Sequence, residues 1–114
     1  MNKPLGIYVN NWIFGNATLA EVAKRTSKLG FDGIELVGEP SIYRPSEVNG
    51  IMQDYGLEVL SICGMHPGPE ADDLRLLSHP DKSERTRAID YVRTCVDLAK
   101  ETGGRSVLVV PSLV

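Results

Sequence analysis

The feature that most constrains the fold is an alternation between short β-prone runs and stretches whose apolar residues recur at helical spacing. The β-prone runs cover residues 6–9, 33–37, 57–62 and 106–110 of the 114-residue chain. Three helical stretches separate them. Strands that alternate with helices imply right-handed crossovers and a parallel sheet. The sequence therefore predicts one α/β domain over residues 1–114, with four parallel strands and three helices.

Local signals mark the ends of the first two helices. Thr18 and Glu21 form a capping-box pattern at the start of the first helix, and Gly30 suits its C-terminal stop. Pro45 fits the first turn of the second helix, and Gly56 is expected to end it. Both helices therefore have a predicted beginning and end.

The third and longest helix is expected to begin near Asp81 or Ser83 and to end at Gly103. A long connection, from residue 64 to about residue 80, precedes it. The residues expected to form its buried stripe are Ala88, Ile89, Val92, Cys95, Val96 and Ala99.

Two architectures fit this order of elements: an open doubly wound sheet, or part of a closed barrel. Residues 10–15, after the first strand, contain no G-x-G-x-x-G pattern, so a Rossmann dinucleotide site is not expected. The chain also has no Walker A pattern. A flavodoxin-like sheet stays open on the pattern of elements alone.

Composition excludes some partners. The formal net charge is −3, which gives no electrostatic reason to bind nucleic acid or an anionic membrane. Cys63 and Cys95 lack C-x-x-C spacing and are expected to be reduced thiols of a cytoplasmic protein. Neither a signal peptide nor an apolar stretch of membrane-spanning length is expected.

Four segments of the sequence resemble a known superfamily. Residues 6–8 followed by Asn11-Trp12 resemble the first strand of ketose 3-epimerases. Residues 28–36, residues 73–85 and residues 98–111 resemble further segments of the xylose isomerase-like TIM barrel superfamily, in the same order and at similar spacing. The inosose dehydratases are related to the same group. The resemblance covers nearly the whole chain and implies the N-terminal half of a barrel.

The resemblance implies a function as well as a fold. Members are usually barrels of eight βα units, of which this sequence holds four strands and three helices. Ketose epimerases and sugar phosphate isomerases move a proton next to a carbonyl with the help of a divalent metal. The resemblance implies Mn²⁺, Mg²⁺, Co²⁺ or Zn²⁺ for a full-length member. Their metal ligands lie on the last four strands, so none is assigned to this sequence. The chain alone is therefore expected to bind no metal and to be inactive.

Candidate site residues follow from strand ends, because barrel enzymes place their sites at the C-terminal ends of the strands. The residues expected to bind a sugar or sugar phosphate are Tyr8, Asn11, Trp12, Glu35 and His66. One alternative stays open for each of three residues. These are that Trp12 packs beneath a loop, that Glu35 forms a structural ion pair with an arginine or lysine, and that His66 shapes its loop. No catalytic residue is assigned.

Other polar residues have less specific expectations. Glu39 is expected to be a solvated loop residue, with a position facing the pocket as the alternative. Arg85 is expected to pair with Asp81 or with a carboxylate at a strand end. A nucleophilic Cys63–His66 pair is conceivable but lacks an orienting third group.

Two further functions stay open beside the sugar isomerase or epimerase: an endonuclease IV-like nucleic-acid enzyme, and a non-catalytic half-barrel that binds a polyol or oligomerises. A half-barrel also exposes the edges of its first and fourth strands. A homodimer, in which the fourth strand of each copy pairs with the first strand of the other, would cover them.

Overall fold

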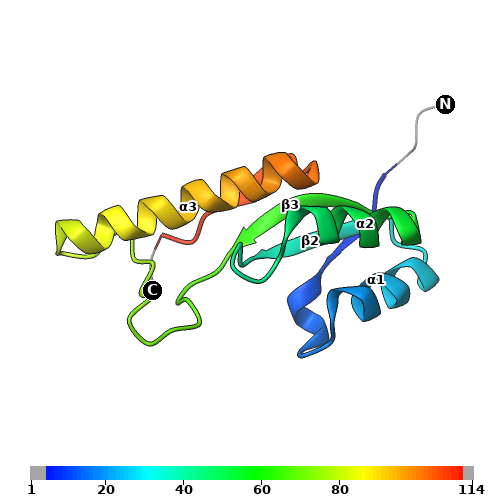
Figure 1. Cartoon of the computed structure of the whole chain (residues 1–114), viewed down its shortest axis with the longest axis horizontal. Coiled ribbons are helices and arrows are strands. Elements are labelled where there is room, and N and C mark those ends of the chain that lie inside the picture. The colour runs from blue at the N-terminus through cyan, green and yellow to red at the C-terminus, as the bar shows by residue number, and fades with distance from the viewer. Residues whose placement is uncertain (1–4, 112–114) are drawn as a thin grey trace.

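The computed structural model describes residues 5–111. It contains four strands, three α-helices and a short 3₁₀ helix (Figure 1). In chain order the elements are β1 (Tyr8–Asn10), the 3₁₀ helix η1 (Asn11–Phe14), α1 (Leu19–Lys28), β2 (Gly33–Gly38), α2 (Pro45–Tyr55), β3 (Glu58–Gly64), α3 (Lys82–Thr102) and β4 (Ser106–Leu108). The sheet is parallel throughout, in the order β1-β2-β3-β4. The α/β fold predicted from the alternating pattern is confirmed.

All three helices cover one face of this sheet. A sequential strand order with right-handed crossovers places every helix on the same side, and α2 contacts both α1 and α3 (Figure 1). Ile34 and Leu36 of β2 and Ile62 of β3 point into the core beneath the helices and are fully buried. An open doubly wound sheet would carry helices on both faces. The fold therefore agrees with part of a TIM barrel. We call the face of the sheet that the helices do not cover the inner face.

The predicted helix boundaries are confirmed by their caps. Thr18 and Glu21 form a complete capping box at the start of α1. Pro45 is the first residue of α2, and Gly56 ends that helix with a left-handed φ of 64°. The side chain of Asp81 caps α3 by accepting a hydrogen bond from the Ser83 amide.

Two features differ from the sequence-based expectation. The buried face of α3 consists of Ala88, Cys95, Leu98, Ala99 and Thr102. Ile89 and Val96, expected in this stripe, are 44% and 51% exposed. They lie seven positions apart on one side of α3, next to its buried face, and apolar spacing alone cannot tell that side from the buried one. The last strand is also shorter than the predicted range 106–110: β4 ends at Leu108.

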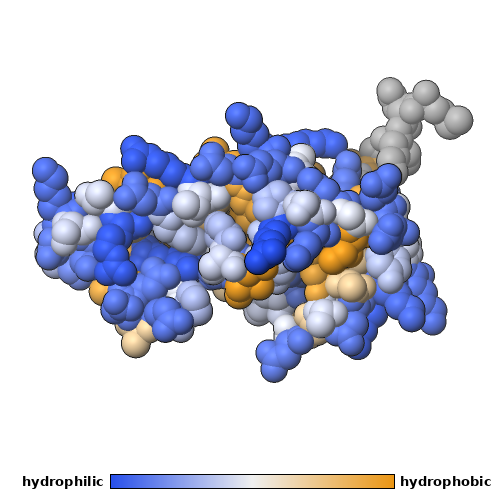
Figure 2. All heavy atoms as spheres, viewed as in Figure 1, coloured by the Kyte–Doolittle hydropathy of each residue, from blue (hydrophilic) through white to orange (hydrophobic). Residues whose placement is uncertain are grey.

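The helical side carries an apolar groove of about 380 Å³ between α1 and α2. Figure 2 shows apolar atoms gathered where these two helices lie side by side. The apolar residues that line the groove are Ala17, Leu19, Ala20, Ile42, Val48 and Ile51. Within residues 5–111, none of the helices combines the length and apolarity that crossing a membrane requires.

Candidate functional site

A row of polar residues crosses the inner face from β1 to β4. Asn10 pairs in register with Glu35, Glu35 with Ser61, and Ser61 with Ser106. Residues paired in register on parallel strands point to the same face of the sheet. The interior of a barrel is usually filled by branched apolar side chains. The polar row, defined as Asn10, Glu35, Ser61 and Ser106, is therefore the first candidate for a site.

Glu35 is the centre of the polar row. Its Oε1 accepts a hydrogen bond from Asn10 Nδ2 at 2.9 Å, and its Oε2 accepts one from Ser61 Oγ at 2.6 Å. No ion pair joins Glu35 to an arginine or lysine of residues 5–111, so neutral donors from the two neighbouring strands hold the carboxylate. Each carboxylate oxygen can accept a further hydrogen bond. The half-buried group is thus oriented while part of its acceptor capacity stays free.

Tyr8 lies on the same face but at the opposite end of the strands. Its hydroxyl donates to Glu58 at the start of β3. Between them lies Gly33, where a Cβ would come within 1.9 Å of the Glu58 carbonyl oxygen. The hydrogen bond to Glu58 raises the pKa of Tyr8. Arg105 Nη2 lies 3.6 Å from the Glu58 carboxylate. The structure therefore places Tyr8 apart from the hydrogen bonds of the polar row.

Asn11 and Trp12 lie in η1, directly after β1. Asn11 is buried; its Nδ2 donates to the Tyr43 hydroxyl at 3.0 Å, and its Oδ1 accepts from the Val37 amide at 2.8 Å. Trp12 is 59% exposed, so it is not packed beneath a loop. Asn10 Oδ1 accepts from the Trp12 amide at 2.8 Å and starts the 3₁₀ turn. Asn10 therefore connects this turn to Glu35.

Cys63 follows Ser61 on the inner face and pairs in register with Val37 and Leu108. Burial, together with the nearby Glu35 carboxylate, raises the pKa of the Cys63 thiol. A raised pKa lowers the fraction of thiolate, which is the nucleophilic form. No described hydrogen bond joins Cys63 to His66. The geometry thus gives no support to a nucleophilic pair.

His66 lies in the long loop between β3 and α3. Its Nδ1 is 2.8 Å from the Leu74 carbonyl oxygen. A carbonyl can only accept, so we assign the proton to Nδ1 and the lone pair to Nε2. Nε2 is buried and has no hydrogen-bond partner within the described chain. His66 therefore orders its loop, and one acceptor atom stays unused.

A second polar cluster surrounds Arg75, a residue that the sequence reasoning did not single out. Its guanidinium binds both carboxylate oxygens of Glu39, at 2.6 and 3.0 Å, and Asp73 at 2.9 Å. It also stacks 3.9 Å above the Tyr91 ring, whose hydroxyl donates to the Gly38 carbonyl. Burial alone would lower the Arg75 pKa, but the hydrogen bonds that Arg75 donates to Glu39 and Asp73 outweigh it and raise that pKa. We call Arg75, Glu39, Asp73 and Tyr91 the Arg75 cluster.

This cluster corrects the expectation for Glu39, which is buried rather than solvated. A carboxylate can be buried here because a bidentate guanidinium partner compensates it. Arg85 also differs from expectation: its Nη1 donates to the carbonyls of His79 and Pro80, both at 2.8 Å. Backbone carbonyls, and not a strand-end carboxylate, therefore hold Arg85. Its other expected partner, Asp81, lies within electrostatic range: hydrogen bonds from Ser83 chiefly lower the Asp81 pKa, and the charge of Arg85 adds to this.

The described residues do not form a metal centre. Within residues 5–111, no group of three or more His, Cys, Asp or Glu side chains could hold a metal ion. Glu35 is hydrogen-bonded by the neutral side chains of Asn10 and Ser61 and lies near the Cys63 thiol, and Glu39 and Asp73 are already neutralised by Arg75. The donor set therefore does not fit the divalent ion that the superfamily resemblance implies.

Comparison with protein families and solved structures gives a consistent picture of the fold. The family model described as xylose isomerase-like TIM barrel matches residues 23–114. No curated protein matches the chain in sequence.

Three similar solved structures are enzymes of different activities. The 3-keto-D-glucoside 4-epimerase of E. coli superposes with a TM-score of 0.72 at 21% identity, over 91% of this chain and 37% of that one. D-psicose 3-epimerase of Clostridium cellulolyticum H10, solved with D-tagatose, gives 0.68 at 18% identity, over 90% and 36%. An AP endonuclease, family 2, of Brucella melitensis gives 0.67 at 17% identity, over 90% and 40%. The chain thus spans 36–40% of the length of these proteins, and at such identities the likeness concerns the fold.

Proposed function

This chain belongs to the xylose isomerase-like TIM barrel family, and on that premise we propose that it is the N-terminal part of a metal-dependent sugar or sugar phosphate isomerase or epimerase. In this proposal residues 1–114 form the first half of the barrel and supply one side of the sugar-binding cavity. The protein would act in carbohydrate metabolism in the cytoplasm.

The observation that carries the proposal is the oriented carboxylate of Glu35 on the uncovered inner face. Asn10 and Ser61 each use one donor on it, at 2.9 and 2.6 Å, and leave acceptor sites free. Sugar hydroxyls are hydrogen-bond donors that such a carboxylate can bind. Trp12, exposed at the end of β1, offers an aromatic ring on which the apolar face of a sugar can stack. The solved epimerase with bound D-tagatose supports a ketose as the ligand class.

The reaction would be proton transfer next to a carbonyl, which requires an acid and a base on opposite faces of the sugar. The described residues line only one side of such a cavity. They also provide no group for a metal ion, so no step is assigned to a metal here. We therefore propose that this chain alone does not turn over ketoses, and that substantial turnover of D-tagatose with added Mn²⁺ or Mg²⁺ would contradict the proposal.

A nucleic-acid enzyme of the same family is the competing function. The AP endonuclease neighbour has a similar TM-score. The inner face of this chain carries unpaired negative charge at Glu35, which would repel a phosphate backbone. The sugar proposal is favoured for that reason.

We also propose that two copies associate through their open sheet edges. Among residues 5–111, no strand pairs with the outer edge of β1 or of β4. Leu108 of β4 is 51% exposed, and Val109 and Val110 beyond it are also exposed. Pairing β4 of each copy with β1 of the other would cover these edges and enclose the polar row.

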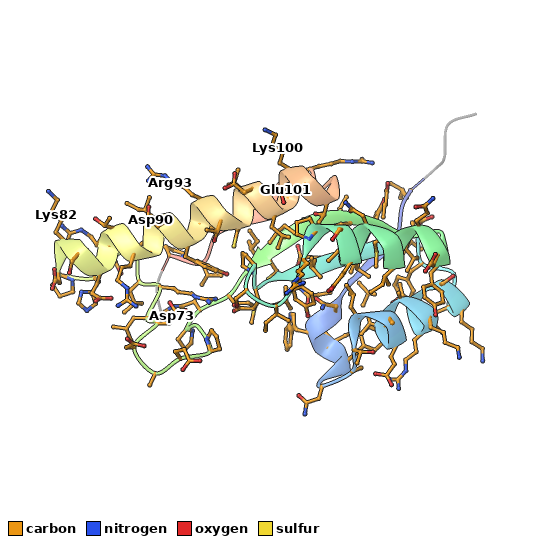
Figure 3. The ribbon with its side chains drawn as sticks, in the orientation of Figure 1. Asp73, Lys82, Asp90, Arg93, Lys100 and Glu101 are labelled. Atoms are coloured by element: carbon orange, nitrogen blue, oxygen red, sulfur yellow. The ribbon has the colours of Figure 1, made fainter. Side chains whose placement is uncertain are left out.

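A binding experiment on the 114-residue chain tests the site. Titration with D-tagatose, followed by ¹H–¹⁵N NMR, is expected to shift the signals of Asn10, Glu35 and Ser61. Glu35→Ala should weaken the binding at least several-fold, because the ligand loses an oriented acceptor. Glu101→Ala, which removes an exposed carboxylate of α3 on the helical side of the sheet (Figure 3), should leave it unchanged. Shifts confined to other regions, or equal effects of the two variants, would reject the site.

A further inference from the structure

The helical side of the sheet carries a surface that neither the core nor the polar row explains. Its hollow is the apolar groove of about 380 Å³ between α1 and α2. Ile42 borders this groove and is 62% exposed, although a large apolar side chain gains free energy when it leaves water. A hollow and an exposed apolar side chain therefore lie next to each other on one face of the molecule.

The turn that presents Ile42 is fixed by the rest of the structure. The amides of Ile42 and Tyr43 donate to the Glu39 carbonyl at 2.9 and 3.0 Å. Asn11 Nδ2 donates to the Tyr43 hydroxyl at 3.0 Å, and Arg75 binds the Glu39 carboxylate. Residues that are already ordered lose less conformational entropy when they bind. Ile42 is thus held in place for a contact.

Two opposite charges line the same groove. Arg44 is the N-cap residue of α2, and Glu47 lies in the first turn of that helix; both are exposed. Within residues 5–111, no ion pair engages either of them. Arg44 makes no side-chain hydrogen bond to cap α2 either. The groove therefore offers a partner one cation and one carboxylate, three positions apart. We call the groove, Ile42, Arg44 and Glu47 the α1–α2 face.

A second copy of this chain supplies the chemistry that complements this face. In a two-fold symmetric interface the same patch meets itself, so every contact occurs twice. When two α2 helices lie antiparallel about an axis near residues 45 and 46, Arg44 lies opposite the partner's Glu47, and Glu47 lies opposite the partner's Arg44. The same axis directs Ile42 toward the partner's groove beside Val48. The α1–α2 face is therefore complementary to itself in both shape and charge.

We propose that two copies of this chain associate through the α1–α2 face, with Ile42 of each copy in the groove of the other and two reciprocal Arg44–Glu47 ion pairs. The face lies on the helical side, so the inference goes beyond the proposed function and does not depend on it. It is also separate from the pairing of the sheet edges. Because the contact is small and exposed ion pairs add little affinity, we expect a dissociation constant of about 1 mM.

Dilution of the 114-residue chain tests the contact. Between about 2 mM and about 50 µM, the ¹H–¹⁵N NMR signals of Ile42, Arg44 and Glu47 should shift, since this range spans the expected dissociation constant. Ile42→Ala should weaken the association several-fold, because its side chain no longer fills the partner's groove. Constant signals at these three residues, or shifts confined to β1 and β4, would overturn the inference.

Charge reversal distinguishes a second copy from any other occupant. Arg44→Glu leaves only carboxylates among the charged residues that line the groove, and Glu47→Arg leaves only guanidinium groups. Each variant alone should therefore self-associate at least tenfold more weakly than the unaltered chain. Mixed in equal amounts, the two variants should associate at least as tightly as the unaltered chain, because each carries the charge that the other lacks.

Arg93→Glu is the matched control, because it makes the same reversal on the exposed side of α3 (Figure 3). It should leave the self-association unchanged. Equal weakening by Arg93→Glu and Arg44→Glu would overturn the inference, since the effect would then come from net charge. A mixture of the two groove variants that does not associate would also overturn it and would assign the groove to a different partner. Neither result would alter the sugar titration at the polar row.

Discussion

At the scale of single residues, the most constrained side chain is Arg75. It is 8% exposed and has a positive φ of 51°, which is uncommon for a residue other than glycine. A buried guanidinium is tolerated only when its donors are paired, and here Glu39, Asp73 and the Tyr91 ring provide that pairing. Because these partners come from the end of β2, the long loop and α3, Arg75 ties the loop to the C-terminal edge of the sheet.

Removing this side chain should therefore be costly. Arg75→Ala leaves the buried Glu39 carboxylate without its partner, and the free energy of unfolding should fall by about 3–5 kcal/mol. Arg93→Ala is the matched control: Arg93 pairs with Asp90 on the exposed side of α3 (Figure 3), and its loss should cost about 0–1 kcal/mol. Urea unfolding followed by circular dichroism measures both values. Similar costs for the two variants would show that Arg75 does not hold the loop.

At the scale of elements, the close pairing of β2 with β3 depends on glycine. Gly33 pairs with Glu58 in register, and the ladder shifts by one residue between Ile34 and Glu35. This irregularity lets Glu35 pair with Ser61. The hydrogen bond that orients Glu35 is therefore a consequence of strand register as well as of residue type. A change that disturbs the start of the ladder should also disturb the polar row.

Two glycine substitutions should change the stability in opposite directions. Gly33→Ala disturbs the strand pair, and Gly50→Ala is a comparison at an open position of a helix. Gly33→Ala places a Cβ within 1.9 Å of the Glu58 carbonyl oxygen, so the strands must separate, and the free energy of unfolding should fall by about 1–3 kcal/mol. Gly50→Ala lies in the interior of α2, where a Cβ meets nothing within 4 Å. It should stabilise the chain by about 0.5–1 kcal/mol through helix propensity. Thermal unfolding of both variants provides the measurement, and a stable Gly33→Ala chain would contradict the close pairing.

At the scale of the whole molecule, the sheet has one face covered by helices and one face open. The principal dimensions are 49 × 30 × 27 Å, because α3 and the long loop extend beyond the C-terminal edge of the sheet (Figure 1). Leu77 of this loop donates to the Pro111 carbonyl at 3.0 Å, which joins the loop to the segment after β4. This hydrogen bond holds the long loop against the segment that follows β4.

The proposed association of two copies is tested at this scale. Leu108→Lys adds a charge to the exposed edge strand β4, and charged edge residues oppose edge-to-edge pairing. Sedimentation velocity should show a dimer for the unaltered chain and a monomer for the variant, with little change in thermal stability at low concentration. Lys28→Glu is the control, because it changes a charge on α1, away from the sheet edge, and it should leave the dimer in place. A well-folded monomer of the unaltered chain at all concentrations would exclude the dimer.

Much of the local structure could be predicted from the sequence, because it depends on neighbours along the chain. The alternation of elements, the capping box at Thr18 and the helix end at Gly56 are all set by contacts within a few residues. The resemblance to the xylose isomerase-like family was also readable in the sequence and is confirmed. Glu35 was identified as an inner-face candidate because it is a carboxylate in an apolar strand. Whether it binds a sugar stays a prediction.

The tertiary structure decided which of the polar residues meet. Ser61 joins Glu35 only through the irregular register of β2 and β3, and Arg75 reaches Glu39 across 36 positions of sequence. Likewise, the exposure of Ile89 and Val96 depends on which flank of α3 has a neighbour. Periodicity and composition contain no information about such long-range pairing, since it is set by how the strands align and how the loop folds back. The sequence by itself therefore determined the order, the ends and the family of the elements, and packing determined the polar row and the Arg75 cluster.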